Sequence, residues 1–168
     1  MKQTITLAIL MLLTFTSVFA KDRTSKHTTV KNDWMSVTYG QPMKKGRVIF
    51  SETGLVPFGQ IWRTGADEAT EVTLTKDCMF AGHQLKAGTY TLITKPGKAE
   101  WTVILNSKLG QWGAYDYEKN IATNVIEGTA TVKQLDKVVE TFTITLEKEA
   151  IVLSWDQTSV IIPVKSFN

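Results

Sequence analysis

The sequence predicts an all-β fold: an antiparallel β-sandwich or jelly roll of about eight to ten strands, with a closed barrel as the second choice. Three observations lead to this prediction. Apolar residues alternate with polar ones in short runs, and glycine-rich turns separate the runs. In addition, no stretch after residue 33 has the i, i+3, i+4, i+7 spacing of an amphipathic helix. Residues 55–61 and 117–123 are the best candidates for short helical turns.

Residues 1–20 have the pattern of a signal peptide. Lys2 precedes an uncharged, mostly apolar run from residue 5 to residue 19, and polar residues follow Ala20. We therefore expect cleavage after Ala20 and a periplasmic or secreted protein. The alternative is an uncleaved membrane anchor, but the apolar run is shorter than the ~18–20 residues that a spanning helix needs. We expect no stable membrane span after cleavage.

Residues 21–33 predict a flexible leader. Nearly all of them are polar or charged, and Val30 is their only aliphatic residue. His27 lies in this leader, where a solitary imidazole is typically solvated. The alternating pattern begins at residue 34, so we expect residues 34–168 to form a single β domain, which is long enough to bury a core without cross-links.

Period-two alternation is clearest near the C-terminus, where alternate residues of half-buried antiparallel strands face the core. The residues expected to face the core are Tyr90 and Leu92; Trp101, Val103 and Leu105; Phe142, Ile144 and Leu146; Ile151, Leu153 and Trp155; and Val160, Ile162 and Val164, with Trp34 also in the core. Residues 147–150 and 156–158 are predicted hairpin turns. Cys78 is followed by Met79 and Phe80, so we expect an inert buried thiol rather than a nucleophile.

The composition does not favour a nucleic-acid partner, a metal ion or another cofactor. The chain has 19 basic and 16 acidic residues, and its net charge of +3 is too slight to predict nucleic-acid binding. Of the two histidines, one lies in the predicted leader and His83 has no second ligand at a regular spacing. We therefore expect no metal site and no other cofactor, with His83 at an exposed turn. No serine has the context of a catalytic triad. The oligomeric state stays open.

Six segments together resemble one known family. They are VTYGQP (37–42), KGRVIF (45–50), GLVPFG (54–59), WRTGADEAT (62–70), AGTY (87–90) and QWGAY (111–115). They are similar to the DUF2911 family of exported bacterial proteins, common in Bacteroidetes, which has no assigned function. The chain departs from the usual family pattern at Gln41, where arginine usually precedes the proline, and at Asp67, where asparagine is usual. The resemblance implies an exported β domain and implies no reaction.

We predict a loop-lined site for a small polar ligand or a glycan. Trp62 and Trp112 lie beside glycine-rich loops, and binding residues concentrate on loops that a rigid sheet positions. Arg63 adds a planar guanidinium suited to a carboxylate or to vicinal hydroxyls. The predicted site comprises Tyr39, Arg47, Trp62, Arg63, Asp67, Glu68, Trp112 and Tyr115. The competing interpretation is that the aromatic residues pack in the core beneath a long loop.

The adjacent acids Asp67 and Glu68 point to opposite faces if they lie on a strand, so they cannot then flank one substrate. We expect Glu68 to pair with Arg63 or Arg47, because an unpaired buried carboxylate is costly. A second hypothesis is a hydrolase or isomerase that uses Glu68, Asp67 or Asp116 with Arg63. It predicts a raised pKa for the carboxylate, whereas pairing with arginine predicts a lowered one.

A third hypothesis is a structural or interaction module of the cell envelope. It predicts an open strand edge or a contiguous apolar surface patch in place of a concave site. The sequence alone leaves open whether the protein is an enzyme.

Overall fold

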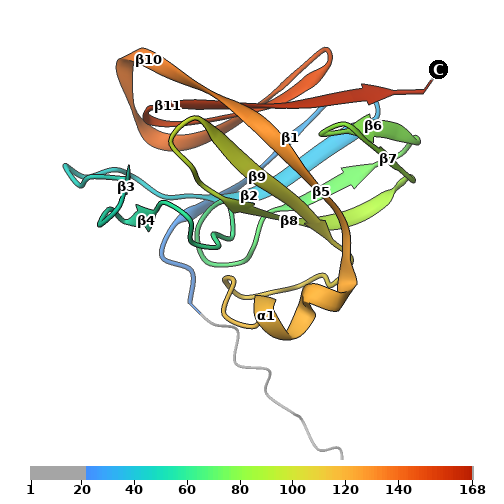
Figure 1. Ribbon diagram of the computed structural model, residues 1–168, viewed down its shortest axis with the longest axis horizontal. Helices are drawn as coiled ribbons and strands as arrows, with labels where there is room; N and C mark the ends of the chain where they lie inside the picture. The colour runs from blue at the N-terminus through green and yellow to red at the C-terminus, as the bar shows by residue number, and fades with distance from the viewer. Residues whose placement is uncertain (1–21, 168) are drawn as a thin grey trace, which may run out of the picture.

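The computed structural model describes residues 22–167, so the predicted signal peptide and its cleavage after Ala20 lie outside the described residues. Nine strands form one antiparallel sheet, confirming the all-β class (Figure 1). In sheet order they are β1 (Lys26–Lys31), β2 (Met35–Gln41), β5 (Glu71–Leu74), β8 (Gly88–Lys95), β9 (Glu100–Asn106), β10 (Asn124–Glu147), β11 (Ala150–Ser166), β6 (Cys78–Phe80) and β7 (His83–Leu85).

The remaining elements are small. Strands β3 (Phe50–Ser51) and β4 (Val56–Pro57) form a parallel pair in a long loop. Helix α1 (Tyr117–Asn120) continues into the 3-10 turn η1 (Ile121–Thr123), which confirms the helical turn predicted at 117–123. Residues 55–61 form turns around β4 and no helix. In the part of the chain that the structure describes, no helix has the length and apolar character to cross a membrane.

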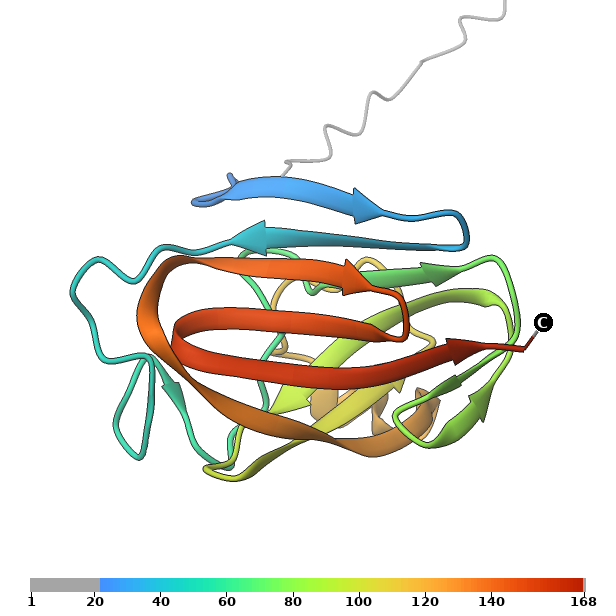
Figure 2. The same cartoon turned by 90° about the horizontal axis from the view of Figure 1, so that it is seen from above.

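Strand β10 turns the sheet into two layers. Its first part pairs with β9, from Asn124 opposite Asn106 to Thr131 opposite Glu100. Its second part pairs with β11 down to the hairpin at residues 147–150, and the register shifts between residues 134 and 143 mark where it bends. Viewed from above, β10 wraps around β11 (Figure 2). Within residues 22–167 the sheet keeps two edges, β1 and β7, and is an open sandwich rather than a barrel.

The two layers meet again where β2 ends. Met43 forms an isolated bridge with Thr141, and the amide of Lys44 donates to the carbonyl oxygen of Glu140 at 2.7 Å. The amide of Ile144 on β10 donates to the hydroxyl oxygen of Tyr39 on β2 at 2.9 Å. These bonds hold one end of the sandwich together and form the base on which the cleft described below is built.

The core is apolar and rich in aromatic rings. Every residue in the predicted alternating runs from Trp101 onward is buried except Leu146, and Tyr90, Leu146 and Trp34 are partly buried against the core. Trp101 and Trp155 are each only 1% exposed. The ring of Phe50 packs edge-on against that of Trp101, with centroids 4.9 Å apart. Edge-on pairs of this kind add to the stabilisation that burial alone provides.

Cys78 is fully buried on β6, as predicted. Burial, and after it the nearby carboxylate of Asp77, raise the pKa of its thiol to about 11. A thiol with so high a pKa is largely protonated at neutral pH and is a poor nucleophile. His83 is exposed at the start of β7, beside the tight turn after Ala81, also as predicted.

The predicted hairpin turn at 156–158 is wrong, because these residues lie inside β11. Asp156 has φ 54° and pairs out of register with Val139, so the local irregularity is a bulge in a continuous strand. The polar residues that suggested a turn instead accompany this bulge.

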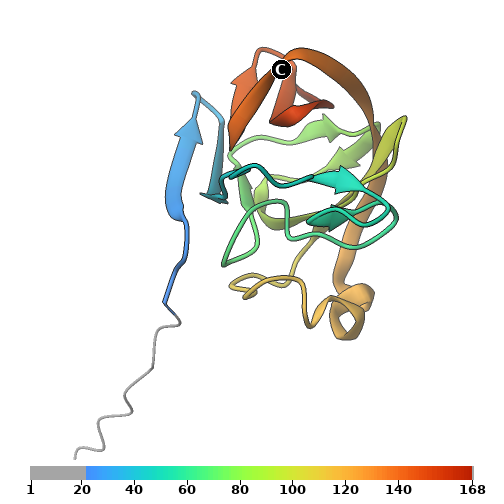
Figure 3. The ribbon, with the colours of Figure 1, turned by 90° about the vertical axis from the view of Figure 1, so that its left-hand side faces the viewer.

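The flexible leader predicted for residues 21–33 is also wrong over residues 26–31. They form β1, an edge strand antiparallel to β2 from Lys26 opposite Gln41 to Lys31 opposite Ser36 (Figure 3). Backbone hydrogen bonds hold this strand, and Val30 packs against the core. Because one side of an edge strand faces solvent, few apolar side chains are needed, and composition does not reveal the strand.

Candidate functional site

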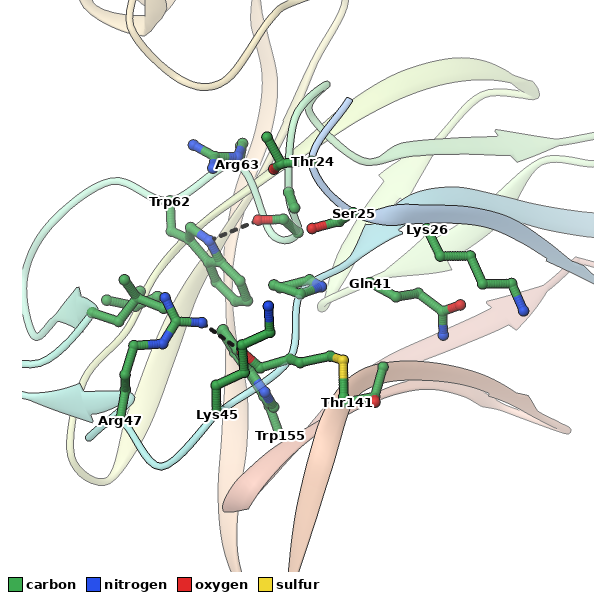
Figure 4. Close-up of a pocket in the computed structure, with 16 residues that line it drawn as sticks. Thr24, Ser25, Lys26, Gln41, Lys45, Arg47, Trp62, Arg63, Thr141 and Trp155 are labelled. Carbon is green, nitrogen blue, oxygen red and sulfur yellow. Dashed lines mark hydrogen bonds between the residues drawn. The ribbon is translucent and has the colours of Figure 1, made fainter. Parts of the chain in front are cut away.

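A cleft with a volume of about 550 Å³ opens where four parts of the chain meet. These parts are residues 24–26 before and at the start of β1, the end of β2 with the turn after it, the loop at residues 62–66, and the bent part of β10 with β11 (Figure 4). Leu55 and Val56, at the start of β4, complete the lining. Volumes of about 300–1,000 Å³ are typical of small-molecule sites. A concave site of ligand size therefore lies at the end of the sandwich where β2 and β10 meet.

The loop at residues 62–68 approaches β2 more closely than most side chains allow. A Cβ added to Gly40 would clash with the carbonyl oxygen of Ala66 and would lie 2.9 Å from Nε2 of His27. A Cβ added to Gly65 would lie 3.0 Å from the carbonyl oxygen of Gly40. The two glycines therefore allow the backbones of β2 and the loop to pack directly, which fixes the loop at the rim of the cleft.

Two residues with positive φ shape the same loop. Thr64 has φ 58° and Asp67 has φ 61°. Asp tolerates this conformation, but a β-branched residue there is strained. Thr64 is fully buried, and its hydroxyl group lies 3.0 Å from that of Thr94, while its carbonyl oxygen accepts from the Thr70 hydroxyl at 2.6 Å. These hydrogen bonds hold the strained conformation, as surrounding structure must wherever such strain persists.

The carboxylate of Asp67 anchors the segment that precedes β1. Its Oδ1 accepts hydrogen bonds from the amide and hydroxyl of Thr24 at 3.0 and 2.8 Å, and its Oδ2 accepts from the amide of Ser25 at 3.0 Å. Nε2 of His27 lies 3.3 Å from Oδ2. Burial acts to raise the pKa of Asp67, but these hydrogen bonds outweigh it and keep the pKa below its ordinary value.

Glu68 reinforces this anchor from the next position. Arg23 contacts its carboxylate through Nη2 at 2.8 Å and Nε at 2.9 Å, and this hydrogen bonding is the main cause of the lowered pKa of Glu68. The partner predicted from the sequence, Arg63 or Arg47, is therefore wrong. His27 lies 3.3 Å from both carboxylates and is only partly exposed, which corrects its prediction as a solvated residue in a mobile tail.

The prediction that Asp67 and Glu68 face opposite sides of a strand is also wrong. The positive φ of Asp67 interrupts the extended backbone, so both carboxylates turn toward the same N-terminal segment. They do not line the cleft themselves. Instead they hold Thr24 and Ser25 in place, and these two residues form part of its wall.

Three of the eight predicted site residues line the cleft: Arg47, Trp62 and Arg63. Trp62 is 7% exposed and stacks on Trp155 with centroids 6.0 Å apart. Arg47 donates from its guanidinium to the carbonyl oxygens of Lys44 and Met43. Trp62 thus packs in the core, as the competing interpretation predicts, and also lines the cleft.

Arg63 is the most unusual group in the cleft. Its Nε is buried and has no hydrogen-bond partner among the described residues. A buried donor left unpaired normally costs about 1–3 kcal/mol. One donor of this cationic group is therefore left without a partner among the described residues.

The other predicted residues lie elsewhere. Tyr39 is 2% exposed and belongs to the core, where its hydroxyl group bonds to β10. Trp112 lines a separate, smaller cavity of about 150 Å³, and its backbone bridges that of Glu68. The side chain of Tyr115 is exposed, and the residue lines neither cavity. The positions of the eight predicted residues in the sequence do not show which of them lie together in the folded chain.

Several cleft residues were not singled out as site residues from the sequence. Thr24, Ser25 and Lys26 were assigned to a leader, and no pattern in that stretch indicated otherwise. Gln41 did carry a signal, since it is one of the two positions where the chain departs from the usual family pattern. Lys45 carried no such signal.

The three carboxylates considered for acid–base chemistry all have lowered pKa values. Hydrogen bonding to Arg23 does this for Glu68, several hydrogen bonds do it for Asp67, and hydrogen bonding to Lys119 does it for Asp116. This is the behaviour expected of paired carboxylates rather than of a general acid at neutral pH. Within residues 22–167, no group of three or more His, Cys, Asp or Glu residues is placed to hold a metal ion.

Comparisons with known proteins identify a family but no activity. A family model described as "Protein of unknown function (DUF2911)" matches residues 21–164. Searches of curated proteins and of solved structures found no significant match to this chain.

The anchoring role of Asp67 can be tested by Asp67→Gly, because glycine accepts the positive φ while the carboxylate is lost. We expect the free energy of unfolding to fall by about 1–2 kcal/mol and trypsin to cleave after Lys26 or Lys31 in the native protein. Chemical denaturation and limited proteolysis measure the two effects.

Asp156→Gly is the matched control, since Asp156 is another aspartate with positive φ and lies far from these cleavage sites in the sequence. It should leave the N-terminal strand resistant. If both variants, or neither, became susceptible to trypsin in this strand, the anchoring role would be wrong.

The lowered pKa values of Asp67 and Glu68 predict how the anchor depends on pH. The ordinary values are 3.8 for Asp and 4.5 for Glu. The stabilisation is fully present above these values and is lost as pH falls through the lower values of the folded protein. The free energy of unfolding of wild-type protein should exceed that of Asp67→Asn by a constant amount between about pH 7 and pH 5, and the difference should shrink below about pH 4.

Denaturant unfolding at a series of pH values measures this difference. A difference that stayed constant down to about pH 2 would show that ionisation of Asp67 does not contribute to the anchor.

Proposed function

The chain belongs to the DUF2911 family, and from this premise we propose that it is an exported protein that binds a small polar ligand or a glycan in the cleft. Because the family description gives no activity, the proposal comes from the geometry of this chain. The observation that carries it is the guanidinium of Arg63, which lines a ligand-sized cleft and has no internal partner for its buried Nε.

The rest of the cleft supports the same proposal. Ligand sites combine apolar walls with a few polar groups that fix the orientation of the ligand. Here the edge of Trp62 and the side chain of Leu55 provide apolar surface, and Gln41, Thr24 and Thr141 provide amide and hydroxyl groups. Such groups match the hydroxyls and ring faces of a sugar or a similarly polar metabolite.

A cleft-filling substitution tests this function without changing charge. Thr141→Trp places a large ring in the cleft, whereas Thr145→Trp places the same ring at an exposed position of β10 outside it. A ligand present at about 100 times its dissociation constant should raise the melting temperature of wild-type protein by about 5–10 °C. We expect the Thr145→Trp variant to respond equally and the Thr141→Trp variant not to respond.

The screen uses a panel of mono- and oligosaccharides and polar metabolites, with melting followed by the fluorescence of the tryptophans. A ligand that stabilised the Thr141→Trp variant as much as wild type would bind outside this cleft. Absence of any stabilisation across the panel would leave the proposed function without support.

Export is the second part of the proposal. The family match begins at residue 21, directly after the predicted cleavage position at Ala20, which supports removal of residues 1–20. When the full chain is produced in a bacterial host, we expect intact-mass measurement of protein from the periplasm or medium to give a chain that begins at Lys21. Full-length protein retained in the cytoplasm or membrane fraction would contradict export.

An interaction module of the cell envelope remains a second candidate, because β1 is an edge of the sheet within the described residues. An edge strand can pair with a strand from another protein. However, Lys26 and Lys31 lie at the two ends of β1, and charged residues on an edge disfavour such pairing.

A further inference from the structure

The cleft is strongly cationic. Lys26, Lys45, Arg47 and Arg63 line it, and no Asp or Glu is among its lining residues in the described part of the chain. Within residues 22–167, none of these four cations forms a salt bridge. The net charge of the whole chain is only +3, so the charge concentrated in this cleft is a local property.

The described acidic residues that flank the cleft form no salt bridge with these four cations, and each has another ionic or hydrogen-bonding partner. The partners are Lys44 for Asp156 at 3.0 Å, Arg23 for Glu68 at 2.8 Å, the amides of Thr24 and Ser25 for Asp67 at 3.0 Å, and the amide of Lys45 for Glu140 at 2.7 Å. Asp156 and Glu68 are thus paired with cations outside this set, Asp67 and Glu140 are held by backbone amides, and the described lining of the cleft itself carries charged groups of positive sign only. Concave surfaces lined by one sign of charge concentrate ligands of the opposite sign.

The cations surround the cleft from different sides. Figure 4 shows Arg63 and Thr24 at one end and Lys45 and Arg47 on the side of the turn after β2, with Trp62 between Arg63 and this second pair. Lys26 and Gln41 lie on the side of β1. A ligand with several polar groups can thus meet cationic side chains at different points of the cleft. Arginine forks match carboxylate, sulfate and phosphate groups with two parallel hydrogen bonds.

The cleft also has an apolar component that a simple inorganic anion would not use. Met43 and Leu55 line it and are 45% and 47% exposed. Trp62 lines the same cleft. A pyranose ring has apolar C–H faces as well as hydroxyls, so it can cover these side chains while its hydroxyls meet Gln41 and Thr141.

We infer that the cleft binds an acidic saccharide whose anionic groups are recognised by the cationic side chains of the lining, with Arg63 at one end and Lys45 on the side of the turn after β2. This inference rests on the proposed function and adds the class of ligand. The anionic group can be a carboxylate, a sulfate or a phosphate, because the three share the oxygen acceptors that a guanidinium recognises.

Matched saccharides test the inference in the mature protein. Tryptophan fluorescence and calorimetry would compare glucose, glucuronate, glucose 6-sulfate and glucose 6-phosphate, with oligomers of galacturonate beside neutral oligomers of the same length. We expect at least one acidic saccharide to bind about tenfold or more tightly than its neutral counterpart. Its affinity should fall several-fold between about 50 and 500 mM salt, because salt screens exposed charges.

Charge-removing variants locate the contact. Arg63→Gln and Lys45→Gln should each weaken binding of the acidic saccharide about tenfold, while Lys133→Gln, an exposed position of β10 outside the cleft, should not. Lys45 is exposed, so its replacement tests the site even if Arg63→Gln impairs folding. Binding of inorganic phosphate or sulfate as tightly as the saccharide would overturn the saccharide part of the inference.

The outcomes separate this inference from the function on which it rests. Neutral and acidic saccharides that bound equally, with no dependence on salt or on Lys45, would overturn the acidic class and leave a polar-ligand cleft in place. If nothing bound and the Thr141→Trp variant matched wild type throughout, both would fail.

Discussion

The hydrogen bonds that the buried carboxylate of Asp67 accepts from Thr24 and Ser25 determine how the N-terminal segment meets the rest of the molecule. They connect residues 43 and 42 positions apart in the sequence. They fix the residues just before β1, which form one wall of the cleft. A buried carboxylate is stable only when it receives such donors, so anchor and segment depend on each other.

The fold supplies the opposite walls. Because β10 is long enough to bend and serve both layers, its second part returns to the end of β2, and the amide of Phe142 donates to the carbonyl oxygen of Pro42 at 2.9 Å. This meeting leaves a hollow between the end of β2, the strained loop at residues 62–68 and the N-terminal segment. The location of the cleft thus follows from the sheet topology, and its chemistry follows from the loops.

The sequence predicted buried residues correctly in strands where burial of one face requires apolar residues at regular intervals. Phe142, Ile144, Ile151 and Leu153 were predicted correctly because a half-buried strand needs an apolar residue at every second position. Strand β1 was missed because it is an edge strand with a single aliphatic side chain, so no alternation of apolar and polar residues marks it. The bulge at Asp156 was taken for a turn because both features favour the same polar residues.

The candidate site was predictable in part for similar reasons. Arginine and tryptophan beside glycine-rich loops pointed to Trp62 and Arg63, both of which line the cleft. The pairing of Glu68 with an arginine was predicted correctly, but the arginine was wrong. Arg23 lies 45 positions from Glu68, and no local pattern links them. The predicted directions of the Asp67 and Glu68 side chains were wrong, because the alternation of apolar and polar residues does not reveal a positive φ.

Amide hydrogen exchange of the wild-type protein at neutral pH tests the anchored N-terminal segment most directly. The amides of Thr24 and Ser25 lie outside any strand, so only their hydrogen bonds to Asp67 account for slow exchange. We predict that both exchange much more slowly than the same amides in an unfolded peptide. Exchange at the unfolded rate would contradict the account, because the wall of the cleft that this segment forms would then not be held in place.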